Sequence, residues 1–190
     1  MTGSDRDVVA LVRAGDREAF GHLVRKYQGR LFGLVLMMVR EPAGAEEVTQ
    51  DAFVRACRHI AHYDDPRPFY PWLASIAVRL AQNWLRWHGR TTRREGSPLD
   101  SAPEPETATA VLSQLMADER SRRLWQEVAA LSSGERTAVI LYYRDEMSVC
   151  EIAEALGVTT GTIKTLLFRA RRHLRGRLQS VMTSREEIST

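Results

Sequence analysis

A run of cations on one predicted helix has the chemistry to bind the phosphates of a nucleic acid. The stretch MSVCEIAEALGVTTGTIKTLLFRARRHLRGR, residues 147–177, predicts a helix, a tight turn at Gly157 and a second helix. The second helix carries no acid and six cations: Lys164, Arg169, Arg171, Arg172, Arg175 and Arg177. A helix in the DNA major groove uses polar residues for base edges and cations for phosphates. The stretch therefore favours a DNA-binding helix-turn-helix over a basic amphipathic helix of another kind.

Aromatic side chains interleave with cations in the first half of the chain. The aromatic residues are Tyr63, Phe69, Tyr70, Trp72, Trp84 and Trp87, and the cations are Arg67, Arg79, Arg86 and Arg90. Unpaired bases stack on aromatic faces while cations follow the backbone, so this region suits melted or single-stranded DNA. The loop 63–71 contains three prolines and is stiff enough to hold a pocket for an extruded base. Phe69, Trp72 and Trp84 are equally good candidates for the core.

We find no sequence pattern for catalysis. The chain has no phosphate-cradling glycine-rich loop and no nucleophile elbow. Its nearest metal pattern, Cys57-x-His59-x-x-His62, does not place three ligands on one helical face. We therefore expect no catalytic residue, metal or cofactor, and a protein that is not an enzyme. Cys57 and Cys150 are expected to be small buried residues without a disulfide.

The hydrophobic pattern predicts an all-α fold of two small helical domains. Three- and four-residue spacing predicts helices over 5–14, 17–40, 43–62, 72–88, 118–131 and 137–144, ahead of the helix-turn-helix. In the fourth helix the expected buried stripe is Leu73, Ile76, Ala77, Leu80 and Trp84. We divide the chain into a first domain, an acidic proline-rich linker, a second domain and a polar tail, at 1–90, 91–110, 111–180 and 181–190. The longest apolar run, Leu31–Val39, is too short for a membrane span, and no signal peptide is evident, so we expect a cytoplasmic protein.

Four ordered stretches carry a resemblance to a known family. They are GDREAFGHLVRKYQGRLFGLVLMMVR, EPAGAEEVTQDAFVRACRHI, YDDPRPFYPWLASIAVRLAQNWLRW and LSSGERTAVILYYRDEMSVCEIAEALGVTTGTIKTLLFRARRHLR. In this order they resemble a bacterial RNA polymerase sigma factor of the extracytoplasmic-function (ECF) type, from about Asp7 to Leu178 apart from the linker. The resemblance implies a four-helix region 2 and a helix-turn-helix region 4. It also implies a subunit that directs core RNA polymerase to promoters, opening the −10 element and reading the −35 element as duplex.

The resemblance also implies roles for individual residues. Docking on the largest polymerase subunit is implied for Glu47, Gln50, Asp51, Val54 and Arg55. Contacts to the −10 element are implied for Tyr63, Asp64, Arg67, Phe69, Trp72, Arg79, Asn83 and Arg86. Contacts to the −35 element are implied for Thr160, Lys164, Thr165, Phe168, Arg169 and Arg172. The implied partners are the largest and second-largest polymerase subunits, promoter DNA as duplex and as melted strand, and an anti-sigma factor. No membrane insertion of the chain itself is implied.

Two positions depart from the family pattern. The pair Val78-Arg79 stands where the family often has Arg-Asn, and Leu166 stands where an arginine is common. Both departures bear on promoter choice. Two other hypotheses are a free-standing helix-turn-helix regulator, which would bind duplex DNA tightly alone, and a small helical hydrolase, which the missing catalytic set disfavours.

Overall fold

The structure is a computed structural model that describes the backbone of residues 4–63, 67–94 and 119–187. Side chains are described for residues 4–63, 67–88 and 124–177. Within these ranges the chain forms helices and no strand, which confirms the all-α prediction. The predicted −10 residue Asp64 and most of the predicted linker lie outside the described residues.

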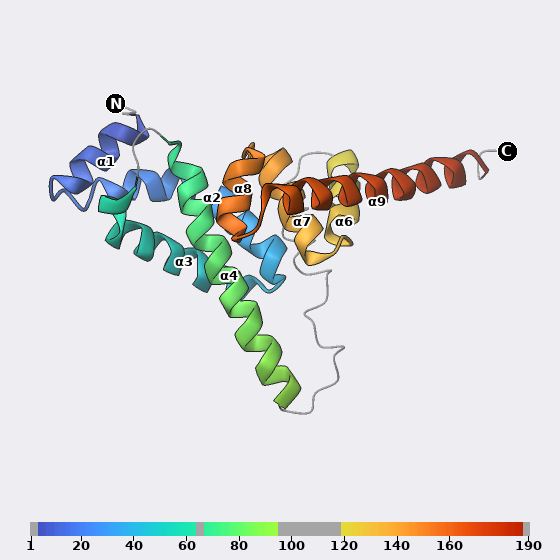
Figure 1. Cartoon of the computed structure of the whole chain (residues 1–190), viewed down its shortest axis with the longest axis horizontal. Coiled ribbons are helices and arrows are strands. Elements are labelled where there is room, and N and C mark those ends of the chain that lie inside the picture. Colours follow the sequence, from blue (N-terminus) through green and yellow to red (C-terminus); the bar gives the residue numbers. More distant parts are fainter. Residues whose placement is uncertain (1–3, 64–66, 95–118, 188–190) are drawn as a thin grey trace.

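In the N-terminal half, the described residues 4–63 and 67–94 form four α-helices and one short 3-10 turn (Figure 1). They are α1 (Asp5–Arg13), α2 (Phe20–Val39), α3 (Pro42–Arg58), η1 (Ile60–His62) and α4 (Phe69–Arg94). Helix α2 supplies the centre of the core, because its second half from Gly33 to Val39 is entirely buried. Arg40, in a left-handed conformation with φ of 63°, ends α2, and Pro42 opens α3 at a position where no N–H is needed.

Among residues 119–187, the C-terminal part that the structure describes, the chain forms four α-helices and a π-helical turn. They are α6 (Glu119–Ala129), α7 (Ser133–Val139), η2 (Ile140–Arg144), α8 (Val149–Leu156) and α9 (Thr160–Glu187). The spacing of Ser132 and Glu135 in the sequence predicts a capping box, and the structure confirms it at the start of α7, where the Ser132 hydroxyl donates to the Glu135 carboxylate at 2.8 Å. A second capping box, between Ser148 and Glu151, opens α8.

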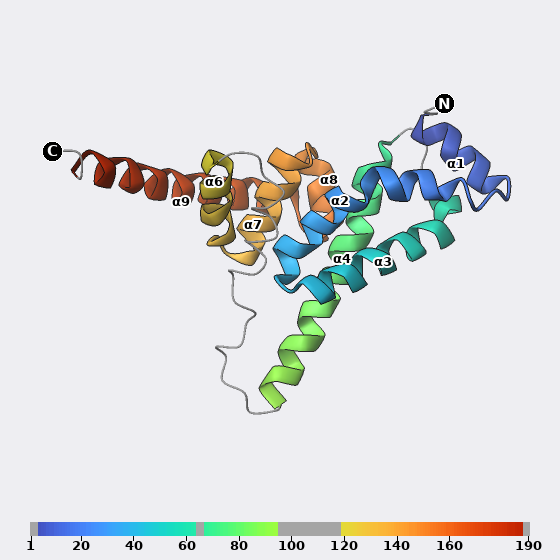
Figure 2. The same ribbon diagram turned by 180° about the vertical axis from the view of Figure 1, so that it is seen from behind.

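The two halves pack against each other. Helix α8 lies beside α4, and α7 lies beside the end of α2, as both views of the ribbon show (Figures 1 and 2). The first part of α4 is therefore enclosed between α2 and α3 on one side and α8 on another, while its last turns project away from the other helices.

Several expected boundaries and environments differ in the structure. Helix α4 begins at Phe69 and continues to Arg94, into the predicted linker, and α9 continues to Glu187 through most of the predicted tail. The expectation that both cysteines are buried is wrong for Cys150, which is exposed, whereas Cys57 is half-buried. Cys150 is the second residue of α8 and lies on the solvent side of a helix that buries Ile152, Ala153 and Ala155.

Candidate polymerase and promoter interface

The predicted docking residues all lie on the solvent face of α3. Glu47, Gln50, Asp51, Val54 and Arg55 are exposed. The opposite face of the helix buries Val48, Ala52 and Ala56, which are spaced by four residues. Val54 is 46% exposed and is an apolar residue within an otherwise polar surface. A face of this composition is suited to a protein partner rather than to the core of its own domain.

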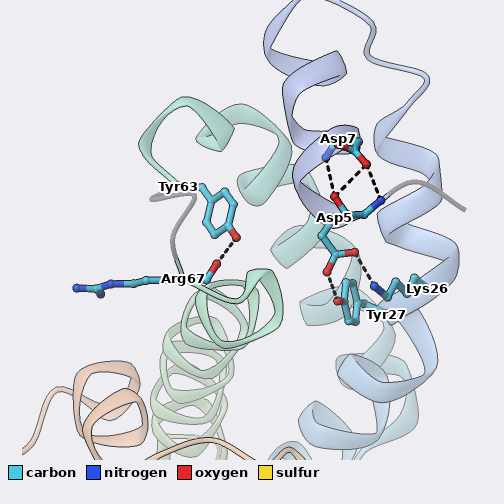
Figure 3. A network of polar contacts seen from close by, with 7 residues as sticks. Asp5, Asp7, Lys26, Tyr27, Tyr63 and Arg67 are labelled. Carbon is cyan, nitrogen blue, oxygen red and sulfur yellow. Dashed lines mark hydrogen bonds and ion pairs between the residues drawn. The ribbon is translucent and has the colours of Figure 1, made fainter.

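An aromatic cluster lies at the described ends of the predicted −10 loop, with Tyr63 and Phe69 buried and Trp72 half-buried. The rings of Tyr63, Phe69 and Trp72 lie with centroids 5.3–5.6 Å apart. The Tyr63 hydroxyl donates to the carbonyl of Arg67 across the loop (Figure 3). Tyr63 and Phe69 are only 4% and 1% exposed, so in this conformation a base cannot stack on either ring. Their proposed contact with a base stays a prediction, and their observed contacts join residue 63 to residues 67–69 on the other side of the loop.

Arg67 points out of this loop, away from Tyr63 (Figure 3). Its guanidinium forms an ion pair with Glu154 of α8, with Nη1 3.1 Å from Oε2. Both side chains are more than 60% exposed, so this pair alone contributes little to stability. The contact nevertheless shows that the predicted −10 loop and the helix-turn-helix lie side by side.

One face of α4 presents the other predicted −10 residues to solvent. Arg79, Asn83 and Arg86 are exposed and Trp72 is half-buried. Trp87, which belongs to the aromatic pattern of this region but is not among the predicted contacts, is 68% exposed near the end of the helix. Its exposure makes it the better stacking candidate, whereas Trp84 is half-buried and stacks on His88 with centroids 3.7 Å apart.

The helix-turn-helix has the turn predicted at Gly157, and of the two threonines that the sequence offers as a cap for the next helix, Thr159 and Thr160, the structure uses Thr159. Gly157 ends α8 with φ of 68°, a conformation that glycine adopts without the usual penalty. The hydroxyl of Thr159 then accepts from the backbone N–H of Thr162 at 3.2 Å and caps α9. Ile163, Leu167 and Ala170 bury the inner face of α9.

The outer face of α9 carries every predicted −35 residue in an exposed position. These residues are Thr160, Lys164, Thr165, Phe168, Arg169 and Arg172. Phe168 is 65% exposed, and the side chains around it are polar or cationic. Arg171, which is not among the predicted −35 residues, is also exposed, and its Nε donates to the Tyr143 hydroxyl at 2.6 Å. Leu166, the departure from the family pattern, is half-buried against the core.

Charged side chains hold α9 and α6 in place around α7. The Glu135 carboxylate lies 3.3 Å from His173 Nδ1 of α9. Burial acts to raise the pKa of Glu135, but the Ser132 hydroxyl, the Ser132 N–H and His173 outweigh it and lower that pKa. Arg136 is buried and donates to the carbonyls of Ala129 and Leu131 at the end of α6. Its burial, with the neighbouring charge of Arg40, lowers its pKa to about 10.

Neither a metal site nor a membrane span is found in the described ranges. Within them, no three His, Cys, Asp or Glu side chains group in a way that could hold a metal ion. None of the helices described there combines the length and the apolar character that a span requires.

Comparison with known proteins identifies both halves of the chain. Residues 23–91 match Sigma-70 region 2, and residues 121–174 match Sigma-70, region 4. The chain is 31% identical over 181 residues to the ECF RNA polymerase sigma factor SigW of Bacillus subtilis, covering 90% of this chain and 94% of SigW. It is 31% identical over 166 residues to the probable RNA polymerase sigma factor RfaY of Xanthomonas campestris, covering 87% of this chain but only 42% of RfaY.

A solved structure shares the fold. It contains the sigma factor RpoE of Bartonella quintana in complex with the anti-sigma factor NepR, and its match has a TM-score of 0.68 at 22% identity over 84% of this chain and 96% of that chain. A region 2 and a region 4 in one helical chain define the class of sigma-70-type factors. The chain belongs to the ECF sigma factors of bacterial RNA polymerase.

Proposed function

We propose that this chain binds core RNA polymerase and directs promoter-specific initiation, with region 4 reading the −35 element and region 2 opening the −10 element. The observation that carries the proposal is the α9 surface. Six residues predicted to contact the −35 element lie exposed on one face of a helix whose other face is anchored in the core. A recognition helix in the major groove needs this arrangement of an anchored side and a polar side.

The three surfaces have separate tasks in this proposal. The exposed face of α3 docks on the largest polymerase subunit through Glu47, Gln50, Asp51, Val54 and Arg55. On α4, Arg79, Asn83 and Arg86 follow the backbone of the melted strand, while Trp72 and Trp87 offer aromatic faces to bases. The loop residue Arg67 contributes a further cation. Val78 is fully buried and therefore contributes no contact to DNA in this conformation.

We base the domain boundaries, the non-enzymatic role and the cellular location on the same family membership. We assign region 2 to residues 1–90, the linker to 91–110, region 4 to 111–180 and a tail to 181–190. The chain acts by binding and not as an enzyme, in the cytoplasm where polymerase works. An anti-sigma factor is its proposed inhibitor, supported by the NepR complex of the Bartonella quintana relative.

Transcription in vitro with core polymerase and a selected promoter tests the −35 assignment. Lys164→Ala and Arg169→Ala should each reduce promoter binding by about 5- to 150-fold if the lost contact is to a base, which corresponds to ~1–3 kcal/mol. A promoter with a mutated −35 element should show no further loss with either variant. Arg25→Ala, which removes an exposed cation of α2, is the matched control and should initiate like wild type. Normal initiation by both α9 variants would refute the assignment.

A further inference from the structure

One buried carboxylate joins the two halves of the chain. The side chain of Asp145 is fully buried where region 4 meets α2 and α4. Its Oδ1 accepts from Arg30 Nε at 3.1 Å, and its Oδ2 accepts from the Tyr70 hydroxyl at 2.9 Å. Arg30 belongs to α2 and Tyr70 to α4, so both donors come from the opposite half. Because a buried charge that loses its partners is strongly unfavourable, the carboxylate selects one relative position of the two halves.

Arg144 completes the network from the region 4 side. Its Nε lies 3.0 Å from Asp145 Oδ1, and its Nη2 donates to the Arg30 carbonyl at 3.0 Å. Gly33 of α2 leaves room for this guanidinium, since a Cβ at that position would lie 3.0 Å from Arg144 Nη1. The Arg30 guanidinium also covers the Tyr70 ring, with its Cζ 3.9 Å from the centroid. The four side chains therefore form one connected unit across the interface.

The backbone that presents Asp145 is unusual. A π-helical turn, Ile140–Arg144, comes immediately before it, and Glu146 follows with φ of 52°. This left-handed conformation is unfavourable for a residue that has a Cβ. Local backbone strain and π-helical turns recur where a structure places a functional side chain. Here the side chain that they place is the buried carboxylate of the interface.

A second, separate contact holds the same two halves. Arg40, which ends α2, donates from Nη2 to the carbonyl of Ala129 at the end of α6. Burial lowers the pKa of Arg40, and Arg136 donates to the same carbonyl from within region 4. A cation at the C-terminal end of a helix is favourable, so region 2 supplies one of the groups that stabilise α6.

The arrangement in which the two halves pack together, which we call the closed form, is too compact to contact both promoter elements at once. The −35 and −10 elements are named for positions about 25 base pairs apart, roughly 85 Å of B-form DNA at ~3.4 Å per base pair. Arg67 of the −10 loop contacts Glu154, and Thr160 follows Glu154 by six residues, so α9 begins within roughly 25 Å of that loop. The predicted −35 contacts then extend along α9 for roughly another 18 Å, from Thr160 to Arg172.

We propose that Asp145, with Arg30, Tyr70 and Arg144, is a latch that holds the free protein closed and must open before both promoter elements can be read. The covalent connection permits the opening, because a chain as long as residues 95–118 spans up to about 85 Å when fully extended. The docking face of α3 stays exposed in the closed form, so polymerase can bind first and separate the halves afterwards. This consequence for promoters rests on the proposed function, whereas the latch itself does not.

The distance between spin labels on the full chain tests the latch without polymerase. The labels are placed at Ala43→Cys in α3 and Ser133→Cys in α7, two exposed positions near the contact between Arg40 and Ala129, with both native cysteines replaced by alanine. The test variant is Arg30→Glu with Tyr70→Phe, which removes both cross-interface donors and places a like charge beside Asp145. Each lost hydrogen bond to the carboxylate should shift the ratio of open to closed protein about tenfold to a hundredfold.

The matched control is Lys26→Glu with Tyr27→Phe, both on α2, the helix that carries Arg30. Lys26 and Tyr27 donate to Asp5 within region 2, so this pair undergoes the same chemical change without crossing the interface. Wild type and control should give one short, narrow distance, and the test variant should give long, broad distances. A broad distribution for wild type would show that no closed form exists. A test variant that stays short and narrow, or a control that opens equally, would show that Asp145 is not the latch.

Promoter binding then separates the latch from the proposed function. With core polymerase, the Arg30→Glu and Tyr70→Phe double variant should bind a promoter that has both elements more tightly than wild type does. The expected factor is the ratio of the open fractions of the two proteins. If wild type and variant both fail to form a promoter complex, the proposed function is wrong while the distance result stands. If wild type and variant form promoter complexes of equal affinity, the closed form does not limit promoter recognition.

Discussion

Gly44→Ala is predicted to destabilise region 2 although it replaces glycine by the best helix former. Gly44 lies in the first turn of α3 against Trp84 of α4. A Cβ there would lie 2.7 Å from Cε2 of Trp84, closer still to Cζ2, and 2.6 Å from Glu41 Oε2. The ring has little freedom to move, because it stacks on His88 at 3.7 Å. The contact therefore sets how closely the docking helix approaches the −10 helix.

The magnitude follows from three contributions. Overpacking of this kind costs ~1–3 kcal/mol. The Glu41 carboxylate also accepts from the Gly44 N–H at 3.0 Å, and losing that cap costs ~1 kcal/mol. The gain in helix propensity is at most ~1 kcal/mol. We expect a net loss of about 1–3 kcal/mol in the free energy of unfolding, measured by urea titration.

Gly29→Ala is the matched control for this substitution. Gly29 is exposed in α2, and a Cβ there would have nothing within 4 Å. The same replacement should therefore raise stability by ~0.5–1 kcal/mol. If Gly44→Ala proves as stable as wild type, or if both substitutions stabilise equally, the packing of α3 on Trp84 is not as close as the structure indicates.

Two further predictions concern region 4. Arg172→Gln should reduce the slope of log K against log salt for promoter binding by about one unit, because we expect its exposed guanidinium to meet a phosphate; an unaltered slope would contradict that contact. Glu135→Gln should destabilise region 4 at neutral pH, and the difference from wild type should shrink as pH falls below about 4.5, the ordinary pKa of the group. The sign follows because the folded pKa is lowered, so the stabilisation is present above the unfolded pKa and lost in acid. Urea midpoints between pH 7 and pH 3 measure it, and a constant difference would count against a contribution from the charge.

The sequence predicted the fold class, the helix-turn-helix and its caps because these depend on local signals. The capping box from Ser132 to Glu135, the turn at Gly157 and the apolar spacing of α9 are all properties of short stretches. The exposure of the docking residues on α3 followed equally from their position off the buried stripe. In each case a few adjacent residues decide the outcome.

The environment of the −10 loop was harder to predict because aromatic residues serve both cores and nucleic-acid surfaces. Tyr63 and Phe69 are buried, whereas Trp87 is exposed, and nothing in their spacing distinguishes them. Helix α4 also buries Tyr70, Ala74 and Val78 beside the expected stripe. That second stripe arises because α4 packs on region 4 as well as on its own domain, a contact between distant parts of the chain.

The interface at Asp145 had no sequence signal at all. An aspartate after a tyrosine- and arginine-containing helix is unremarkable in sequence, and its partners Arg30 and Tyr70 lie more than seventy residues away. Only the packing of the two halves brings these groups together. Buried polar networks between domains depend on tertiary contacts that local patterns do not contain.

The most direct test of the central claim is co-elution with bacterial core RNA polymerase on gel filtration. Wild type should co-elute, and Asp51→Arg should not, because it reverses an exposed charge in the centre of the predicted docking face of α3. Glu18→Arg reverses another exposed charge of region 2, between α1 and α2 and not on α3, and it should co-elute like wild type. If wild type, purified without any inhibitor, elutes apart from the polymerase, the proposed function is contradicted. If Asp51→Arg remains folded and still co-elutes, docking takes place through another surface.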